Sequence, residues 1–482
     1  MWNPKEGFYF RLPATGQNLV VSWIGSRLKR RRFGPGFERF VGFLETSERD
    51  DPERLRAYQS ERLALVVRHA YETVPHYRDV MDRLGLRPAD VRSVDDLPKL
   101  PVLTRAEVAA AGRRLLSSRA GSLGTRKVST SGTTGAPLTL YWDRTVSIVT
   151  NALTYRIRRW AGLEPGVRTA VLQGRAIVPL TQTRPPFWRY NRPWNQILLS
   201  ALHLRSENMA HYVEATRRFG ARALISYPSA ASVFARFLED MGETLPLAGV
   251  ILTGEPLADG ERELIEERFE TKVFDVYGQA ERVVHSSECE EHSGHHVFSE
   301  FGVLEVLDEA GEPVPPGRRG RVVATTLHNL SMPLIRYTFG DTVVLSERTC
   351  PCGRTLPLIE GVAARDEDLL VLPGDRIMPP LAIIKGFGMV PGLTRAQIIQ
   401  EEMDAILVRL ETPSEIGPEL EAELHAYVAT RLGPEVRARF ERVDEIPLSG
   451  RGKFRRVISK VPLPWDRQAR PGPDAPDGSD AP

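Results

Sequence analysis

The sequence predicts a multidomain α/β protein, with a large N-terminal body of parallel strands flanked by helices and a small α+β unit at the C-terminus. Three observations predict this class. The chain has 482 residues, too many for one compact core. In its middle, short β-forming runs alternate with helical segments, which is typical of βαβ units. After about residue 298 the strands become closely spaced and are separated by Gly and Pro, which indicates a β-rich subdomain.

Composition excludes several classes of protein. Hydrophobic residues make up 41% and charged residues 26%, which is typical of a soluble globular chain. The net charge of +2 gives no reason to expect a nucleic acid as partner. Three cysteines cannot form a disulfide framework here, so a reduced, cytoplasmic protein is expected. The chain has no run of about 18 apolar residues, so no transmembrane segment is expected.

The first hundred residues are expected to be mostly helical. The apolar run Leu19–Ile24 is followed by the basic cluster Lys29–Arg32, the reverse of the order in a signal peptide. A helix docked on the surface is the favoured interpretation, and an interfacial amphipathic segment is the alternative. Further helices are expected from Ser60 to Val74 and from Tyr77 to Leu84, followed by an extended connector at 97–101.

The central elements follow from their periodicity. The expected strands are Arg168–Leu172, Ala223–Ile225, Gly249–Thr253 and Val273–Val276. The expected helices between them are Met209–Phe219, Ser229–Met241 and Gly260–Phe269. The β-rich region adds the expected strands Val303–Leu307, Gly320–Thr326 and Thr342–Leu345.

The C-terminal unit is expected to be separate from the body. After one strand it should hold a helix at Arg395–Asp404, a strand at Ile406–Glu411 and a helix at Leu420–Leu432. The tail after Trp465 is rich in Pro, Gly and Asp and is expected to be disordered. The expected domains are therefore 1–363, 364–465 and a tail at 466–482.

A hydroxyl-rich segment is the clearest chemical signal. It consists of Ser129, Thr130, Ser131, Gly132, Thr133, Thr134, Gly135, Ala136 and Pro137. In such a loop, backbone N–H groups and hydroxyls can face an anion, and the glycines allow close approach. The segment lacks the Gly-Lys-Ser ending of the Walker loop, so an ordinary ATPase is not indicated. A flexible Ser/Thr linker is the alternative interpretation.

Three further segments carry polar groups at turns. Tyr277, Gly278 and Glu281 follow a predicted strand, at the edge where parallel sheets bind ligands. Asp341 follows a Gly turn and could accept hydrogen bonds from two ribose hydroxyls. Lys453 lies in a loop rich in glycine. Taken singly, these are also consistent with solvated surface turns and an ordinary basic loop.

In this order and at these separations, the four segments resemble the adenylate-forming superfamily of acyl-CoA synthetases, nonribosomal adenylation domains and luciferases. Within it the chain is similar to the branch of phenylacetate–coenzyme A ligase, coenzyme F390 synthetase and CapK-type proteins. The stretches Ala70–Arg78 and Asp95–Pro101 look like the usual opening of that branch. The resemblance extends from about residue 55 to residue 462.

The resemblance implies roles for individual residues. It makes the hydroxyl-rich loop from Ser129 the site of the ATP β- and γ-phosphates. The residues implied at the nucleotide are Gly254, Glu255 and Pro256 on the adenine side, Tyr277 and Gly278 at its border, and Asp341 at the ribose. Glu281 would bind Mg²⁺, and Lys453 would reach the α-phosphate and the attacking carboxylate. Arg365 resembles the hinge arginine, although Ala364 stands where the family often has Gly.

The resemblance also implies a reaction. Residues 1–363 would be the adenylation core and residues 364–465 the mobile AMP-binding lid. ATP would activate a carboxylic acid as acyl-AMP with release of pyrophosphate, and coenzyme A or a carrier protein would then take the acyl group as a thioester. The alternatives are transfer to an amine, AMP transfer to a hydroxyl as in coenzyme F390 synthetase, and a nucleotide-binding protein without catalysis. The oligomeric state stays open, with a homodimer among the alternatives.

The cysteines form a separate group. Cys289, Cys350 and Cys352, together with a nearby histidine, match a closed tetrahedral site for structural Zn²⁺. Some relatives of phenylacetate–coenzyme A ligase have a similar Cys, Gly-x-His, Cys-x-Cys arrangement, whose register selects His296, with His295 as the competitor. Two small buried cysteines and an unrelated Cys289 are the alternative.

The acid is not identified by the sequence. The segment 184–194 is rich in aromatic residues and lacks the Gly-rich Tyr-Gly stretch that is typical of aryl-acid ligases. Its aromatic side chains could line an acyl pocket or pack as a surface loop, and neither is favoured. The segment looks more like CapK-type proteins, so phenylacetate is not assumed.

Overall fold

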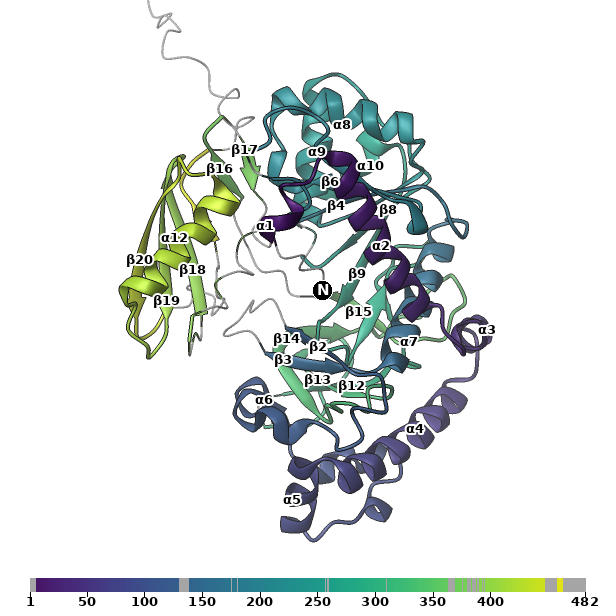
Figure 1. Cartoon of the computed structure of the whole chain (residues 1–482). Coiled ribbons are helices and arrows are strands. Elements are labelled where there is room, and N and C mark those ends of the chain that lie inside the picture. The colour runs from purple at the N-terminus through teal and green to yellow at the C-terminus, as the bar shows by residue number, and fades with distance from the viewer. Residues whose placement is uncertain are drawn as a thin grey trace, which may run out of the picture.

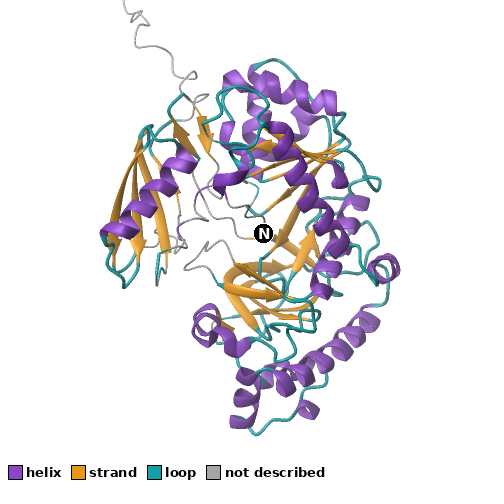
Figure 2. Cartoon of the chain, in the orientation of Figure 1, coloured by secondary structure: helices purple, strands orange, loops and turns teal. Residues whose placement is uncertain are grey.

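The structure is a computed structural model of the chain. It describes residues 6–129, 138–174, 176–179, 181–255, 257, 260–308, 310–362, 369–374, 376–378, 383, 387, 390–391, 393, 395–446 and 457–462. Its strands gather in one large sheet and a smaller four-stranded sheet, with helices packed around both (Figure 1; Figure 2). The predicted α/β class is confirmed.

One half of the large, 13-stranded sheet is mainly parallel, as the alternation of strands and helices predicted. Its neighbours run in the order β9-β8-β7-β4-β6 and are all parallel, and β5 closes the edge antiparallel. The bounds are β4 (Thr169–Gln173), β5 (Trp188–Asn191), β6 (Gln196–Ser200), β7 (Ala223–Ser226), β8 (Gly249–Thr253) and β9 (Val273–Gly278). The connecting helices are α8 (Ser206–Phe219), α9 (Pro228–Asp240) and α10 (Glu261–Phe269).

The other half of the same sheet is antiparallel and is the predicted β-rich region. Its order is β12-β13-β14-β15-β11-β10, and β10 joins it to β9. The bounds are β10 (His285–Ser287), β11 (His295–Val297), β12 (Gly302–Leu307), β13 (Arg319–Thr326), β14 (Tyr337–Leu345) and β15 (Leu358–Val362). The short strand β1 (Leu103–Thr104) pairs parallel with β14.

Helices of the N-terminal region cover this sheet. They are α1 (Glu6–Tyr9), α2 (Ala14–Arg32), α3 (Phe37–Ser47), α4 (Pro52–Thr73), α5 (Pro75–Arg83), α6 (Arg105–Ala111) and α7 (Arg144–Trp160). The extended connector expected at 97–101 is wrong in part, because a 3₁₀ helix covers Val94–Lys99. The Asp96 carboxylate accepts hydrogen bonds from the backbone N–H groups of Arg92 and Ser93 and stabilises the first turn.

A hairpin of β2 (Arg126–Ser129) and β3 (Thr139–Trp142) carries the two ends of the hydroxyl-rich segment. Ser129 pairs with Thr139 in the register of these strands. Residues 130–137 lie outside the described part of the chain. No helix among the described residues is both long and apolar enough to cross a bilayer.

The C-terminal unit consists of a four-stranded sheet, a helix and a small hairpin. Its elements are β16 (Leu370–Leu372), β17 (Arg376–Met378), β18 (Arg395–Glu402), β19 (Ala405–Glu411), α12 (Pro418–Leu432), β20 (Arg437–Val443) and β21 (Val457–Ser459). The predicted helix at Arg395–Asp404 is wrong. Its residues form β18, which is hydrogen-bonded to β19 on one side and to β21 on the other, so tertiary pairing overrides the helical pattern.

The hydrophobic cores follow this division. Separate buried clusters lie against the parallel half, against the antiparallel half and beneath α3 and α7. A further cluster is formed by residues 370–457 together with Leu202 of the body. Arg376 extends this junction, because its guanidinium donates to the carbonyl oxygens of Leu202 and Leu432. The predicted boundary at 363/364 and the tail lie outside the described residues.

Candidate active site and metal-binding cluster

The carboxyl ends of β8 and β9 lie next to each other and carry two of the predicted segments. Gly254 follows β8 with a φ of +91°, which favours glycine. The Glu255 side chain turns back to α9, where it accepts hydrogen bonds from the Ser229 backbone N–H (3.1 Å) and hydroxyl (2.5 Å). The predicted adenine-side turn is thus fixed to the start of a helix, although Pro256 lies outside the described residues.

Tyr277 and Asp341 meet across the sheet. Tyr277 is the penultimate residue of strand β9, and its hydroxyl donates to Asp341 Oδ2 at 3.0 Å. Asp341 does not follow a turn, as the sequence suggested, but lies inside β14. There the register with β13 shifts near Gly340, whose φ is +88°. A bulge of this kind redirects side chains, which explains how a strand residue reaches the neighbouring site.

Glu281 lies beside this pair and is only 6% exposed. Its Oε1 accepts from the Tyr337 hydroxyl at 3.1 Å and is 3.3 Å from Arg105 Nη1. Burial raises the pKa of the Glu281 carboxyl, while Arg105 acts in the opposite direction. Both side-chain donors reach one oxygen, so Oε2 has no side-chain donor among the described residues. A buried carboxylate whose second oxygen receives no side-chain hydrogen bond is suited to bind Mg²⁺ through that oxygen.

Arg105 and Tyr337 are site residues that the sequence did not predict. Arg105 begins α6, directly after β1, and Tyr337 begins β14. The pairing of Leu103 with Tyr337 brings both to Glu281, which lies 176 residues from Arg105 in the sequence. Tyr337 lies four residues before the predicted Asp341, whereas Arg105 is far in the sequence from every predicted site residue.

Several predicted residues lie outside the described part of the chain. They are Thr130 to Gly135 of the hydroxyl-rich loop, Arg365 at the hinge and Lys453. The structure therefore brings together Tyr277, Glu281 and Asp341, while the positions of the loop and the lysine relative to them stay predictions.

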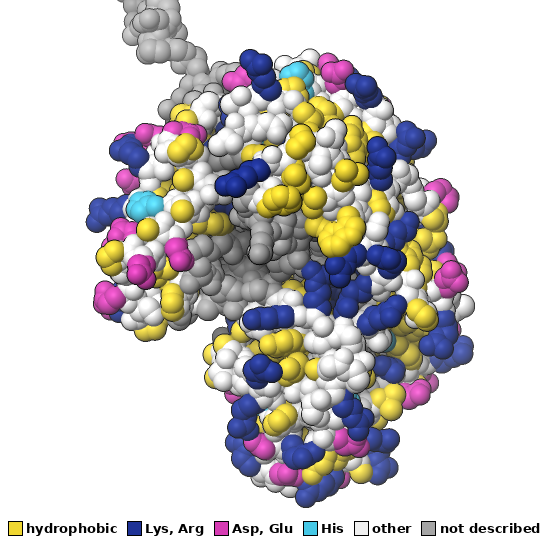
Figure 3. Space-filling model, viewed as in Figure 1, with side chains coloured by type: hydrophobic (Ala, Val, Ile, Leu, Met, Phe, Trp, Pro, Cys, Tyr) yellow, Lys and Arg dark blue, Asp and Glu magenta, His cyan; other side chains and the backbone are white. Residues whose placement is uncertain are grey.

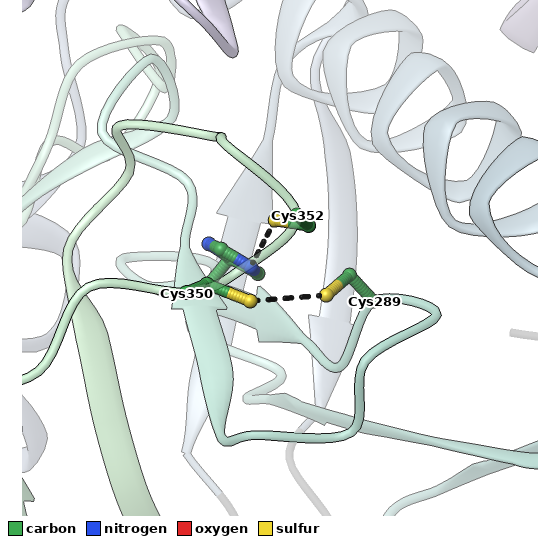
Figure 4. A group of neighbouring side chains, drawn as sticks. Cys289, Cys350 and Cys352 are labelled. Atoms are coloured by element: carbon green, nitrogen blue, oxygen red, sulfur yellow. Dashed lines mark hydrogen bonds between the residues drawn. The ribbon is translucent and has the colours of Figure 1, made fainter.

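The three cysteines and His296 form a compact cluster (Figure 4). Their ligand atoms all lie within 4.8 Å of one another. Cys289 Sγ is 3.5 Å from Cys350 Sγ, and Cys352 Sγ is 3.4 Å from His296 Nε2. Cys289 follows β10, His296 is in β11, and Cys350 and Cys352 precede β15, so the cluster joins the connections of three adjacent strands.

His295 and His296 point to opposite faces of β11, as successive strand residues do. His295 Nε2 lies 3.4 Å from Asp275 Oδ2, away from the sulfur atoms. The backbone N–H groups of Glu291 and Arg354 point to Cys289 Sγ and Cys352 Sγ at 3.5 and 3.4 Å, each from two residues further along the chain. Such donors stabilise thiolates, so the donor set fits a bound zinc ion.

Comparison with known proteins connects these sites to a family. Residues 375–460 match the family model of the CapK C-terminal domain. The chain is 29% identical over 343 residues to phenylacetate-coenzyme A ligase of Thermus thermophilus, covering 70% of this chain and 75% of the relative. It is 23% identical to Protein CapK of Staphylococcus aureus, covering 94% of this chain and 99% of the relative.

Solved structures share the fold. Two structures of 2-hydroxyisobutyryl-CoA ligase, one in the postadenylation state and one in the thioesterification state, each match with a TM-score of 0.56. Each match covers 86% of this chain and 91% of the ligase, at 22% sequence identity. At 22% sequence identity, this similarity shows a shared fold and nothing about the substrate.

Proposed function

We propose that the chain is an ATP-dependent acid–thiol ligase of the adenylate-forming superfamily, in the branch of the phenylacetate–coenzyme A ligases and CapK proteins to which it is similar. It activates a carboxylic acid as acyl-AMP, releasing pyrophosphate, and then transfers the acyl group to a thiol. The observation that carries the proposal is the buried group of Glu281, Tyr337 and Arg105 beside the Tyr277–Asp341 pair.

The reaction has an electrostatic problem that this group helps to solve. A carboxylate must approach the α-phosphorus of ATP, which is itself surrounded by negative oxygens. At about 4 Å and an effective dielectric constant near 20, one such repulsion costs roughly 4 kcal/mol, about a thousandfold in rate. Mg²⁺ bound at Glu281 would offset charge on the phosphates. Arg105 and Tyr337 hold the Glu281 carboxylate in place through its other oxygen.

We assign the remaining roles in the reaction to the residues that the sequence predicted. Asp341 accepts a hydrogen bond from Tyr277 and is the residue that we assign to the ribose hydroxyls. The loop beginning at Ser129 binds the β- and γ-phosphates. Lys453 on the C-terminal unit supplies positive charge at the α-phosphate, and Arg365 marks the hinge of that unit. Rotation of the unit about the hinge then separates adenylation from thioester formation.

Coenzyme A is the acceptor that we favour, because similar proteins are named as coenzyme A ligases. The acid is left open. The phenylacetate–coenzyme A ligase of Thermus thermophilus covers 70% of the chain, whereas Protein CapK, whose name states no substrate, covers 94%. A carrier-protein thiol or an amine could take the acyl group from the same acyl-AMP, whereas the other alternative, transfer of AMP itself to a hydroxyl, involves no acid.

The first experiment is the exchange of labelled pyrophosphate into ATP in the presence of a panel of carboxylic acids. We expect exchange that depends on one class of acid and on Mg²⁺. Repeating the reaction with coenzyme A, with an amine and with no acceptor then identifies the second step. Absence of exchange with every acid would favour a nucleotide-binding protein without catalysis.

We also propose that Cys289, His296, Cys350 and Cys352 bind one structural Zn²⁺. Four protein ligands would close the coordination sphere, so the ion would hold strand connections together and take no part in the reaction.

A further inference from the structure

The outward face of α2 carries two strongly exposed apolar side chains, Leu19 and Trp23. Two further exposed apolar side chains flank the helix in the sequence, Phe8 in α1 and Phe33 directly after the last residue of α2. Leu19 is 72% exposed and Trp23 is 59% exposed. They are four residues apart, so they lie on the same side of the helix, one turn from each other.

The same outward row becomes basic toward the end of the helix. Arg27 follows Trp23 by one turn, and Arg30, three residues further on, is also exposed on this side. Lys29 points instead to the body, where its ammonium donates to the Pro193 carbonyl at 2.9 Å. The Arg27 guanidinium lies 5.0 Å from the centre of the Trp23 ring. No salt bridge to Arg27, Lys29, Arg30 or Arg31 occurs among the described residues, whereas many arginines elsewhere have an acidic partner. Figure 3 shows hydrophobic and basic side chains side by side on the face where Figure 1 places α2.

The inner face of α2 is fixed to the body, so the apolar row cannot turn inward. Gly25 lies so close to the end of β5 that a Cβ atom would be 2.0 Å from Asn191 Oδ1. The Gly25 carbonyl accepts from Trp194 Nε1 at 2.8 Å. Asn18 Oδ1 accepts from the Tyr190 backbone N–H at 2.8 Å, and Gln17 accepts from Arg189. The helix therefore presents Leu19 and Trp23 rigidly to the outside.

We propose that α2 is a membrane-docking element that binds the surface of an anionic lipid bilayer. The row is apolar and then basic over roughly 16 Å of helix, so a flat anionic surface can contact both parts at once. Trp23 and Leu19 would enter the headgroup region, where tryptophan is favoured. Arg27 and Arg30 would extend to the lipid phosphates. An exposed helix flank whose arginines form no salt bridge among the described residues suits a fluid anionic surface better than it suits a rigid protein pocket.

Flotation with lipid vesicles tests this proposal on the full chain. The vesicles consist of phosphatidylcholine alone or with about 30% phosphatidylglycerol. We expect binding to the anionic vesicles only, and loss of binding near 0.5 M salt, where charges are screened within about 4 Å. Arg27→Glu/Arg30→Glu should weaken binding about 25-fold or more, since each basic residue near the surface contributes about fivefold.

The apolar contribution is tested by Leu19→Ser/Trp23→Ser, which should also abolish flotation. Leu65→Ser/Met241→Ser and Arg68→Glu/Arg218→Glu are the matched controls, because they change exposed residues of the same kinds elsewhere, and they should bind as the unchanged chain does. Circular dichroism checks that every variant is folded. Equal binding to neutral vesicles, or unchanged binding of both α2 variants, would overturn the proposal. So would a change from dimer to monomer in the α2 variants without vesicle binding, which would make this face an interface between copies.

Discussion

Glu281 is costly to bury and has no evident structural need for its charge. Its carboxyl is surrounded by the body of the protein, and its pKa is raised chiefly because burial disfavours the ionised form. Tyr337 and Arg105 compensate only in part, through one oxygen. A residue held at such a cost is typical of a functional site, where stability is exchanged for activity.

We therefore expect Glu281→Gln to separate activity from stability. Pyrophosphate exchange should fall by about a hundredfold or more, as is usual when a charge-stabilising group is lost. Because the folded pKa lies above the unfolded one, the ionised carboxylate destabilises the fold increasingly as pH rises through the folded pKa. The melting temperature of the variant should therefore match that of the unchanged chain at low pH and equal or exceed it at pH 8.

The control for this comparison is Glu312→Gln, which removes an exposed carboxylate and should change neither quantity. Full exchange activity in Glu281→Gln would contradict the proposed magnesium ligand.

Three buried histidines predict sensitivity to acid. Burial lowers the pKa of His203, His285 and His328 to about 4, so these side chains are neutral in the folded protein at pH 7. Unfolded histidine titrates near 6.5, so protons bind the unfolded chain first as pH falls. The free energy of unfolding should decrease between pH 6.5 and pH 4, by roughly 1.4 kcal/mol per pH unit for each histidine.

Thermal unfolding monitored by circular dichroism across this pH range would measure the decrease. His328→Gln should make it shallower, because one fewer group takes up a proton on unfolding. A melting temperature that stays constant from pH 6.5 to pH 4 would show that these histidines are not buried as described.

Secondary structure could be predicted from the sequence wherever the local pattern decides it. The strand at Gly249–Thr253 has the predicted bounds, and the helix at Glu261–Phe269 differs by one residue. The strand at Arg395–Glu402 was predicted as a helix because its amphipathic pattern fits either element, and only its two partner strands decide. The sequence likewise marked Tyr277, Glu281 and Asp341, but Arg105 reaches Glu281 only through the pairing of β1 with β14.

A zinc ion in the Cys/His cluster should stabilise the connections between neighbouring strands. It ties the segments around β10, β11 and β15, which are neighbours in the sheet. We expect about one zinc ion per chain by elemental analysis, loss of the ion in Cys350→Ser/Cys352→Ser, and a lower melting temperature after chelation. His296→Gln should also lose zinc.

His295→Gln is the matched control for that experiment, because His295 is adjacent in sequence but points to Asp275. It should retain the ion. Zinc retained by the double cysteine variant, or lost equally from both histidine variants, would refute the ligand set.

At the scale of the whole molecule, the proposed chemistry is divided between two units. Asp341 lies in β14 of the body and Glu281 in the connection between β9 and β10, whereas Lys453 belongs to the chain segment of the C-terminal unit. The described contacts between the units include Leu202 and Ala176 at the C-terminal core, Leu369 at the core of the body, and the hydrogen bond from Arg376 to the Leu202 carbonyl. The proposed rotation between the two half-reactions would have to exchange these contacts.

This division predicts that Lys453→Ala affects one half-reaction selectively. Adenylation, measured by pyrophosphate exchange, should fall by about a hundredfold or more because the charge at the α-phosphate is lost. Thioester formation from supplied acyl-AMP should be nearly unchanged, because that step no longer involves the phosphate chain of ATP. Lys460→Ala is the control, since Lys460 lies in the same unit and pairs with Glu401 at its surface, 2.7 Å away. Equal loss of both half-reactions in Lys453→Ala would mean that the lysine supports the fold of the unit rather than the adenylation step.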